Sequence, residues 1–153
     1  MRRREKEILD PARIEAVLEK ASVCRLVLCD GGQPYVVPVC FGHKNHAIYF
    51  HSAPEGRKLD ILSRNSRVCV ELETDVVFIP NKTACKWDLK YRSVIGFGRA
   101  IRLEAPDEKR EALAVITGHY AHGPFVFSED ILKRTVVFKI ELESLTGKQS
   151  GYE

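Results

Sequence analysis

The chain has 153 residues, of which 44% are hydrophobic and 29% charged, so we expect one domain over residues 1–153 and exclude a wholly disordered chain. The formal net charge is +3, which the three arginines at positions 2–4 could supply, and a nearly neutral body argues against a broad nucleic-acid surface. No apolar run approaches the roughly 20 residues that span a bilayer, and no apolar stretch follows the charged N-terminus. We therefore expect a cytoplasmic protein without a membrane partner.

Five cysteines, an odd number, occur without a visible secretion signal, and no two of them form a C-x-x-C pair. That spacing excludes a thioredoxin-like motif and a zinc ribbon. All but Cys85 lie in or beside apolar stretches. We expect reduced and mostly buried thiols, which suits a cytosolic protein.

The first half of the chain predicts a helix followed by an antiparallel meander. Residues 1–9 form a charged leader that we expect to be mobile. Asp10 and Pro11 have the residue types of an N-cap and a first helical position, and apolar residues at helical spacing then predict a helix over 11–22. Runs rich in β-prone residues predict three strands, at residues 23–29, 35–41 and 47–52. The polar run 42–46 is expected to be a turn, and connections this short indicate antiparallel pairing.

The second half predicts more strands, interrupted by helices. Pro54 and Gly56 end the meander, and a short helix then ends near Asn65. Further strands are predicted at 67–73, 76–79, 91–103 and 135–142, a second long helix at 107–121, and irregular segments at 80–89 and 122–134. Sheets of about six antiparallel strands avoid open edges by closing. The fold class is therefore mainly β, a small barrel with helices packed on its outside.

Arg57 and Lys58 begin the short predicted helix, where cations oppose the partial positive charge of the helix N-terminus. Two adjacent cations become favourable there if they surround a phosphate together with free backbone N–H groups and Ser52. The alternative is a solvated basic pair that is balanced by Glu55 and Asp60. The spacing alone leaves both interpretations open.

Two residues of the meander also have more than one interpretation. Pro38 cannot donate a hydrogen bond to a ladder, so it marks an edge strand or an opening that frees backbone groups for a ligand. His51, at the end of its strand, can contact a ligand, exchange protons, ligate haem, or serve only the fold. Histidines with H-x-x-H spacing occur at 43–46 and 119–122, but no third ligand is identifiable, so we predict no metal site.

Polar residues alternate with apolar ones at the start of the strand predicted over 91–103. Tyr91, Ser93 and Ile95 therefore share one face. Gly96 and Gly98 suggest a bulge and permit the close approach of another backbone or of a flat ligand. An ordinary barrel strand would have the same pattern.

Six short motifs follow one another along the chain. They are V-V-P-V at 36–39, I-Y-F-H-S-A at 48–53, G-R-K-L at 56–59, R-V-C-V-E at 67–71, Y-R-S-V-I-G-F-G at 91–98 and T-G-K at 146–148. As an ordered set they resemble the FMN-binding split-barrel superfamily of pyridoxamine 5′-phosphate oxidase. Within it, the sequence is most similar to the nitroimidazole-resistance flavoproteins, and the resemblance extends over residues 5–148.

The resemblance implies a Greek-key split barrel that forms a homodimer, with two FMN sites at the subunit interface. It implies that the backbone of Pro38 and Val39 lies along the flavin ring. It also implies that His51 and Ser52 line the flavin and its ribityl phosphate. In the resistance branch a histidine that matches His51 handles the substrate, which makes His51 the catalytic candidate.

The remaining matches concern the phosphate and the ring. Arg57 and Lys58 match the family's phosphate-binding pair. Ser93 stands where relatives contact the flavin ring, and Tyr91 joins it on the same face as a cofactor-binding candidate. The oxidase's C-terminal arginine and histidine motif has no counterpart in residues 141–153, so pyridoxamine phosphate oxidation is not expected.

These implications give the hypothesis of a dimeric, FMN-dependent oxidoreductase that reduces small molecules such as nitroimidazoles. No G-x-G-x-x-G fingerprint for a nicotinamide cofactor is present. The alternatives are a haem-binding or haem-degrading split barrel, a non-catalytic flavin-binding protein, and a deazaflavin protein that uses the same basic pair. The physiological substrate and the electron donor cannot be named from the sequence.

Overall fold

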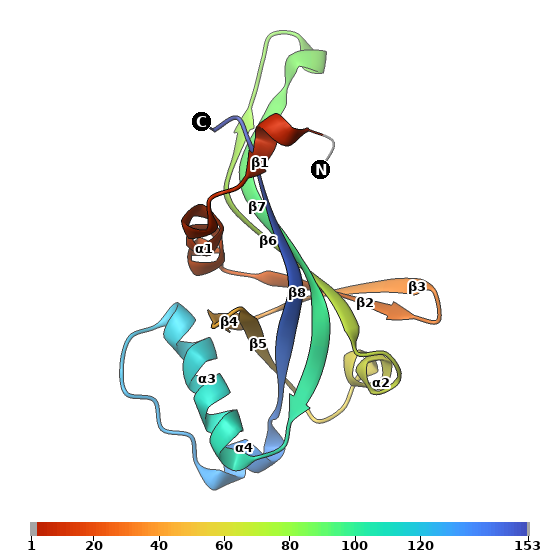
Figure 1. The fold of residues 1–153 in the computed structure, drawn as a ribbon, viewed down its shortest axis with the longest axis vertical. Coiled ribbons are helices and arrows are strands. Elements are labelled where there is room, and N and C mark those ends of the chain that lie inside the picture. The colour runs from red at the N-terminus through yellow and green to blue at the C-terminus, as the bar shows by residue number, and fades with distance from the viewer. Residues whose placement is uncertain (1–2, 153) are drawn as a thin grey trace.

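The computed structural model describes residues 3–152 (Figure 1). Within that range its strands are β1 (Glu7–Ile8), β2 (Cys24–Asp30), β3 (Gln33–Val39), β4 (Phe41–Lys44), β5 (Ala47–Ser52), β6 (Arg67–Ile79), β7 (Asp88–Leu103) and β8 (Val136–Ser150). Its helices are α1 (Pro11–Lys20), α2 (Arg57–Arg64), α3 (Pro106–Tyr120) and α4 (Glu129–Arg134), with short 3-10 turns at η1 (Arg4–Lys6) and η2 (Ala84–Lys86). None of these helices is long and apolar enough to cross a membrane.

The strands form one antiparallel sheet in the order β3-β2-β6-β7-β8-β5-β4, and β1 pairs with β8. The two ends of this order, β3 and β4, are separated in the chain by Cys40 alone. The sheet must therefore curl until its ends approach each other. This confirms the mainly β split barrel with helices on its outside.

The described chain has eight strands instead of about six. β1 and β4 were not predicted, and the segments predicted separately at 67–73 and 76–79 form the single strand β6. β4 occupies most of the run 42–46, which was expected to be a turn. The turn consists of Asn45 and His46 alone, which adopt the left-handed region with φ of 52° and 58°. β1 lies in the leader expected to be mobile. Its Ile8 is 3% exposed and pairs with Gly147, so the leader is anchored to the sheet.

The interior of the barrel is filled by the inward-facing residues of every long strand. Alternation along β2, β6 and β7 directs Leu26, Val70 and Val94 inward, and each of them is fully buried. A second cluster lies on the outside of the sheet, where Leu113 of α3 and Leu132 of α4 cover Val137. Helices therefore cover only part of the outer face, as Figure 1 shows.

Local signals explain where the helices begin. The Asp10 carboxylate accepts a hydrogen bond from the Ala12 amide at 2.9 Å, which confirms the predicted N-cap of α1. α4 was not predicted, and it begins where Ser128 accepts a hydrogen bond from the Ile131 amide. With six residues it is too short to display a helical period.

Gly98 lies at the bulge between β7 and β8, as its position in the sequence suggested. A Cβ atom there would stand 2.1 Å from the backbone oxygen of Glu141, which cannot move without breaking the ladder. We expect Gly98→Ala to lower the free energy of unfolding by about 2–3 kcal/mol or more. Gly118, where an added Cβ meets no atom within 4 Å, is the matched control. Equal melting temperatures for Gly98→Ala and Gly118→Ala would contradict this explanation.

The expectation that most thiols are buried is wrong. All five cysteines are free, but Cys29, Cys40 and Cys85 are exposed and only Cys24 is buried. Cys29 lies on the uncovered outer side of β2, and so its apolar neighbours in sequence do not bury it. Burial raises the pKa of the Cys24 thiol to about 12, so this group is an inert part of the core.

Candidate functional site

The residues predicted to bind a cofactor fall in three places in the fold. His51 and Ser52 end β5, and Arg57 and Lys58 begin α2 after four intervening residues. Pro38 and Val39 end β3, and Tyr91 and Ser93 lie near the start of β7. We call the first group the corner.

The corner is formed because β5 stops where its core contacts stop. His51 and Ser52 pair with Val137 and Val136 of β8, and Ser52 is 8% exposed while His51 is open to solvent. Gly56, with a φ of 132° that favours glycine, then turns the chain into α2. This turn places the first residues of α2 beside the end of β5.

Lys58 is a half-buried cation without a counter-ion. Its ammonium stands 5.8 Å from the centre of the Phe50 ring, and within residues 3–152 it makes no ion pair and no hydrogen bond. Burial lowers the pKa of Lys58. The pKa of His51 is also lowered, first by burial and then by the charge of Lys58. An anion at the corner would relieve both effects.

Arg57 points away from Lys58, although the two are neighbours in sequence. Its guanidinium lies 4.7 Å from the centre of the Tyr35 ring, and its Nη2 is 3.9 Å from the carboxylate of Asp30. Asp30 is bound more closely by Arg64, at 2.8 Å. The expected counter-ions Glu55 and Asp60 form no ion pair with Arg57 in the described part of the chain. More than half of the Arg57 side chain stays exposed.

Pro38 lies on an end strand of the sheet order. Among the described strands β3 pairs with β2 alone, with Pro38 opposite Arg25, so the edge-strand interpretation is correct. Val39 is 8% exposed and is the last residue of the strand, so the ladder opens directly after it. Their contact with a ligand stays a prediction.

Tyr91 and Ser93 line a hollow of about 310 Å³ on the outer face of the sheet. Ser93 is almost fully buried, and Lys148 lies 5.3 Å from the centre of the Tyr91 ring. Two acidic residues that sequence reasoning missed, Glu71 and Glu73, also line it. Their position could have been found from strand pairing, because Glu73 stands opposite Ser93 and Glu71 opposite Ile95.

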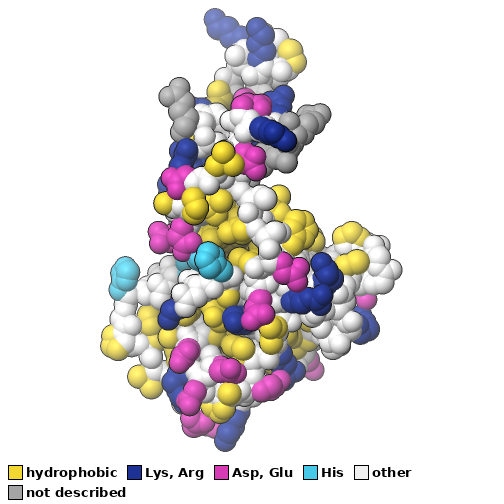
Figure 2. All heavy atoms as spheres, in the orientation of Figure 1, with side chains coloured by type: hydrophobic (Ala, Val, Ile, Leu, Met, Phe, Trp, Pro, Cys, Tyr) yellow, Lys and Arg dark blue, Asp and Glu magenta, His cyan; other side chains and the backbone are white. Residues whose placement is uncertain are grey.

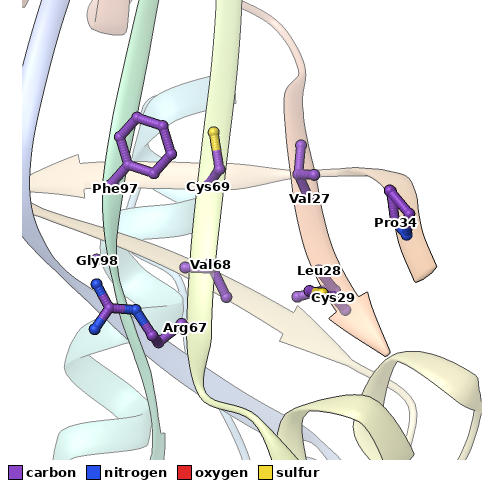
Figure 3. Close-up of a pocket in the computed structure, with 9 residues that line it drawn as sticks. All are labelled: Val27, Leu28, Cys29, Pro34, Arg67, Val68, Cys69, Phe97 and Gly98. Carbon is purple, nitrogen blue, oxygen red and sulfur yellow. The ribbon is translucent and has the colours of Figure 1, made fainter. Parts of the chain in front are cut away.

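A second hollow, of about 260 Å³, continues along the same face (Figure 3). Val27 of β2, Pro34 of β3, Cys69 of β6 and Phe97 of β7 are among its lining residues. Figure 2 shows hydrophobic side chains at the surface across the middle of the molecule, with acidic and basic side chains above and below them. The outer face of β2, β3, β6 and β7 exposes apolar side chains such as Ile95 and Phe97 beside charged ones such as Arg67 and Lys148.

The corner and the hollow at Ser93 do not meet within one chain. His51 is in the same row of the sheet as Val137 and Leu103. Ser93 lies ten residues before Leu103 along β7, a length along the strand of about 33 Å that includes the bulge at Gly98.

One histidine of each H-x-x-H pair contacts a remote part of the chain. His43 is hydrogen bonded to Glu15 at 2.9 Å through Nδ1, and its buried Nε2 has no protein partner within the described residues. His119 Nε2 lies 2.7 Å from the carbonyl oxygen of Ala21. In residues 3–152 no group of three His, Cys, Asp or Glu side chains could hold a metal ion.

Comparison with known proteins agrees with this architecture. A candidate 5-nitroimidazole antibiotic resistance protein from Bacteroides thetaiotaomicron is 33% identical, with a TM-score of 0.85 over 94% of this chain and 86% of that chain. An FAD- and haem-binding protein from Mycobacterium smegmatis, 19% identical, has a TM-score of 0.86 over 96% of this chain and 74% of that one. At 19% identity, this second similarity shows a shared fold and no more.

A curated relative and a family profile complete the comparison. An uncharacterized protein of Rhizobium meliloti (strain 1021) is 26% identical over 98 residues, which are 64% of this chain and 58% of that protein, so the match spans little more than half of the relative. The profile described as pyridoxamine 5′-phosphate oxidase matches residues 10–149. The chain therefore belongs to the pyridoxamine 5′-phosphate oxidase family.

Proposed function

We propose that this chain is an FMN-binding oxidoreductase that acts as a homodimer and reduces small molecules, with nitroimidazoles as the substrate class. The observation that carries the proposal is the corner, where Lys58 is half-buried, has no counter-ion among residues 3–152 and stands beside His51. The ordered sequence motifs and the 33% identical candidate resistance protein support the choice of cofactor and substrate.

The residues of the corner fit the phosphate of a flavin mononucleotide. Arg57 offers a planar fork of donors and Lys58 a point charge, and both lie in the first turn of α2. The buried Ser52 adds a hydroxyl at the end of β5. Because burial disfavours the charge on Lys58, a dianionic phosphate would restore a favourable environment for that ammonium.

When bound, the flavin supplies the transfer of electrons or of a hydride to an acceptor. Lys58 would hold the phosphate, and Arg57, whose side chain is more than half exposed, would join it by turning away from Tyr35 and Asp30. Together they would fix the ring relative to the end of β5. His51, which is open to solvent, can hold a proton at a ring nitrogen for a substrate that gains electrons. Reduction of a nitro group consumes protons as well as electrons, so a proton donor at this position has a defined task.

The proposal is tested by reconstituting the purified protein with excess FMN and then removing unbound ligand. We expect flavin bands in the visible spectrum and about one FMN per chain. Sedimentation at micromolar concentration should give a dimer of the 17.4 kDa chain. Reduction of a nitroimidazole by the chemically reduced holoprotein completes the test. Protein that retains no flavin, or that shows a Soret band instead, would overturn the assignment.

FMN affinity should also depend on pH through His51. The pKa of His51 is below its usual value in the free protein, and a bound phosphate would raise it, so binding takes up a proton. The affinity should therefore increase as the pH falls through the window between these two pKa values. The matched comparison is His51→Gln, since the phosphate's own titration near pH 6 is common to both proteins. Identical pH profiles would show that His51 does not sense the phosphate.

A further inference from the structure

We propose, building on the phosphate site inferred above, that Tyr35 of β3 sets how strongly this protein prefers FMN to riboflavin. Tyr35 does so by holding the Arg57 guanidinium away from the corner in the free protein. Arg57 thus has two alternative positions, one on the Tyr35 ring and one beside Lys58. Binding of the FMN phosphate moves Arg57 from the first position to the second.

The two cations at the start of α2 are directed toward different strands. The Arg57 guanidinium carbon lies 4.7 Å from the centre of the Tyr35 ring of β3, whereas the Lys58 ammonium lies 5.8 Å from the centre of the Phe50 ring of β5. β3 and β5 do not pair within the described sheet. One phosphate is therefore reached by both cations only after one of them has turned.

Arg57 is the cation that can turn. Its side chain is 56% exposed, and besides the Tyr35 ring it approaches only the Asp30 carboxylate, at 3.9 Å from Oδ2, among residues 3–152. That carboxylate is already bound by Arg64 at 2.8 Å, so Tyr35 is the main partner of Arg57. Lys58, by contrast, is half-buried and stays at the corner. An exposed guanidinium on a flexible stem can leave a ring face without disturbing the core.

The Tyr35 ring is a fixed partner for this guanidinium. Tyr35 is half-buried and packs against the core of the barrel. α2 lies against β2, beside the β2–β3 hairpin in Figure 1. The far end of α2 is joined to the same hairpin, because Arg64 binds Asp30 and the Asn65 side chain donates to a backbone oxygen of β2 at 3.2 Å. These contacts do not involve Arg57, so they keep the ring within its reach with or without a ligand.

The two positions of Arg57 compete, and the ligand decides between them. A contact between a cation and an aromatic ring near the surface favours that position by about two- to fivefold. Charge-assisted hydrogen bonds from a guanidinium to a phosphate are stronger, so FMN draws Arg57 away from Tyr35 and loses part of the gain in doing so. Riboflavin has no phosphate and leaves Arg57 on the ring. Tyr35 therefore lowers the affinity for FMN alone.

The first experiment removes the ring. Tyr35→Leu should raise the affinity for FMN by about two- to fivefold and leave the affinity for riboflavin unchanged. Leucine keeps an apolar side chain at this half-buried position but offers no ring face. Tyr35→Phe retains the face and should bind both flavins as the wild type does. Equal gains for FMN and riboflavin, or a Tyr35→Phe variant that behaves like Tyr35→Leu, would contradict the proposal.

The second experiment repeats Tyr35→Leu in an Arg57→Ala background and completes a double-mutant cycle. Without a guanidinium to hold, the loss of the ring should no longer change the affinity for FMN. A gain that persists without Arg57 would show that Tyr35 acts on the ligand by another route, and the proposal would be wrong. Melting temperatures establish beforehand that each variant is folded at the temperature of the titration.

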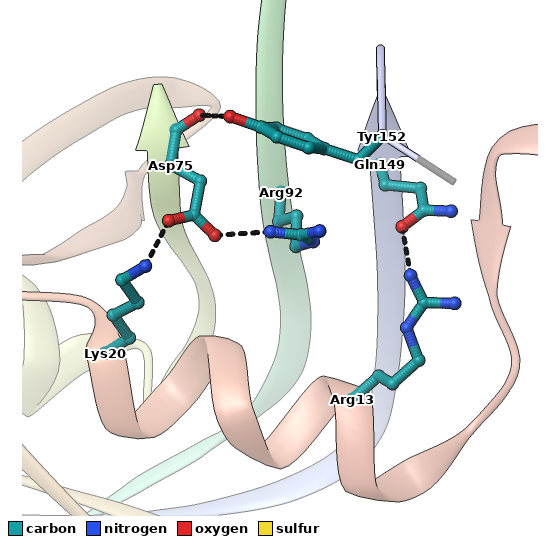
Figure 4. A network of polar contacts seen from close by, with 6 residues as sticks. All are labelled: Arg13, Lys20, Asp75, Arg92, Gln149 and Tyr152. Atoms are coloured by element: carbon teal, nitrogen blue, oxygen red, sulfur yellow. Dashed lines mark hydrogen bonds and ion pairs between the residues drawn. The ribbon is translucent and has the colours of Figure 1, made fainter. Parts of the chain in front are cut away.

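A matched control is a second stack of the same kind, far from the corner (Figure 4). The Arg92 guanidinium carbon lies 4.1 Å from the centre of the Tyr152 ring. Tyr152→Leu removes a ring from beneath an arginine just as Tyr35→Leu does, but it should leave the affinities for FMN and riboflavin unchanged. A gain in FMN affinity as large as that of Tyr35→Leu would overturn the specific role of Tyr35.

The third experiment follows Arg57 in the wild-type protein by nuclear magnetic resonance. Protons above an aromatic ring resonate upfield of their ordinary positions, so the side-chain protons of Arg57 should be displaced in the free protein. Saturation with FMN should remove the displacement, and saturation with riboflavin should not. A displacement that persists with bound FMN would overturn this inference alone. Protein that binds no FMN would disprove the proposed function and this inference with it.

Discussion

Replacing both Arg57 and Lys58 with alanine is expected to weaken FMN binding by about two to four powers of ten. Each charge-assisted hydrogen bond to a phosphate contributes roughly 1.5–3 kcal/mol, and the estimate assumes that the two contributions add. Riboflavin, which lacks the phosphate, should lose far less affinity. The folded double variant is titrated with each flavin, and flavin fluorescence is monitored to obtain the two dissociation constants.

Arg64→Ala provides the control for this experiment. Arg64 is also a largely exposed arginine of α2 that contacts Asp30, but it stands at the other end of the helix. Its loss should leave the FMN affinity close to that of the wild type. Equal losses for FMN and riboflavin in the double variant would mean that Arg57 and Lys58 do not recognise the phosphate. An unchanged FMN affinity would show that Arg57 and Lys58 are a solvated surface pair without a role in binding.

His51→Ala should keep FMN while its turnover of a nitroimidazole falls by about 10²- to 10⁴-fold, which is the usual contribution of a positioned proton donor. Flavin should be retained because the phosphate is held by other side chains. The rate is measured with chemically reduced holoprotein, so that the electron donor does not limit it. His46→Ala, a change at the exposed turn between β4 and β5, is the matched histidine control.

The outcome separates two roles of His51. If His51→Ala loses its flavin or its fold together with its activity, the histidine serves the structure and the substrate role is wrong. If flavin, fold and turnover are all kept, His51 has no part in the reaction. Comparison of melting temperatures with and without FMN distinguishes these cases before any rate is measured.

Signals confined to neighbouring residues made much of the fold predictable. Asp10 and Pro11 specify the start of α1 locally, and Gly31 and Gly32 take the positive φ angles of a tight turn between β2 and β3. The alternation in β7 correctly placed Ser93 and Ile95 on one face. Each of these features depends on a few adjacent residues, so tertiary contacts did not need to be known.

Features that depend on distant segments were missed. α4 and β1 are too short to display a period, and they are held by contacts of Leu132 and Ile8 with remote parts of the chain. The second half of β8 was also missed, because Glu143 and Ser144 face solvent there and hide the strand pattern. Burial of the cysteines was overestimated because sequence does not show which side of a sheet lacks a covering helix.

The candidate site was predicted in its parts but not in its arrangement. The sequence indicated a basic pair at the start of α2, and the structure adds that Arg57 turns toward Tyr35 while Lys58 turns toward Phe50. Side-chain direction at a helix start depends on the strands that lie on either side. Here the contacted rings are distant in sequence, because Tyr35 of β3 is 22 residues before Arg57 and Phe50 of β5 is 8 residues before Lys58. The contacts of Asp75 with Lys20, Arg92 and Tyr152 were missed for the same reason, since these partners come from α1, β7 and the C-terminal segment.

The position of β8 has a consequence for how the chain reaches its native state during synthesis. β8 pairs with β1, β5 and β7, so three strands made earlier lack a neighbour until residues 136–150 leave the ribosome. Until then the nascent chain presents open edges of β5 and β7, which are templates for pairing with other chains. Shortening β8 should therefore reduce soluble yield far more than shortening a peripheral strand such as β4, and chaperones that shield nascent strands should matter most before residues 136–150 have been made.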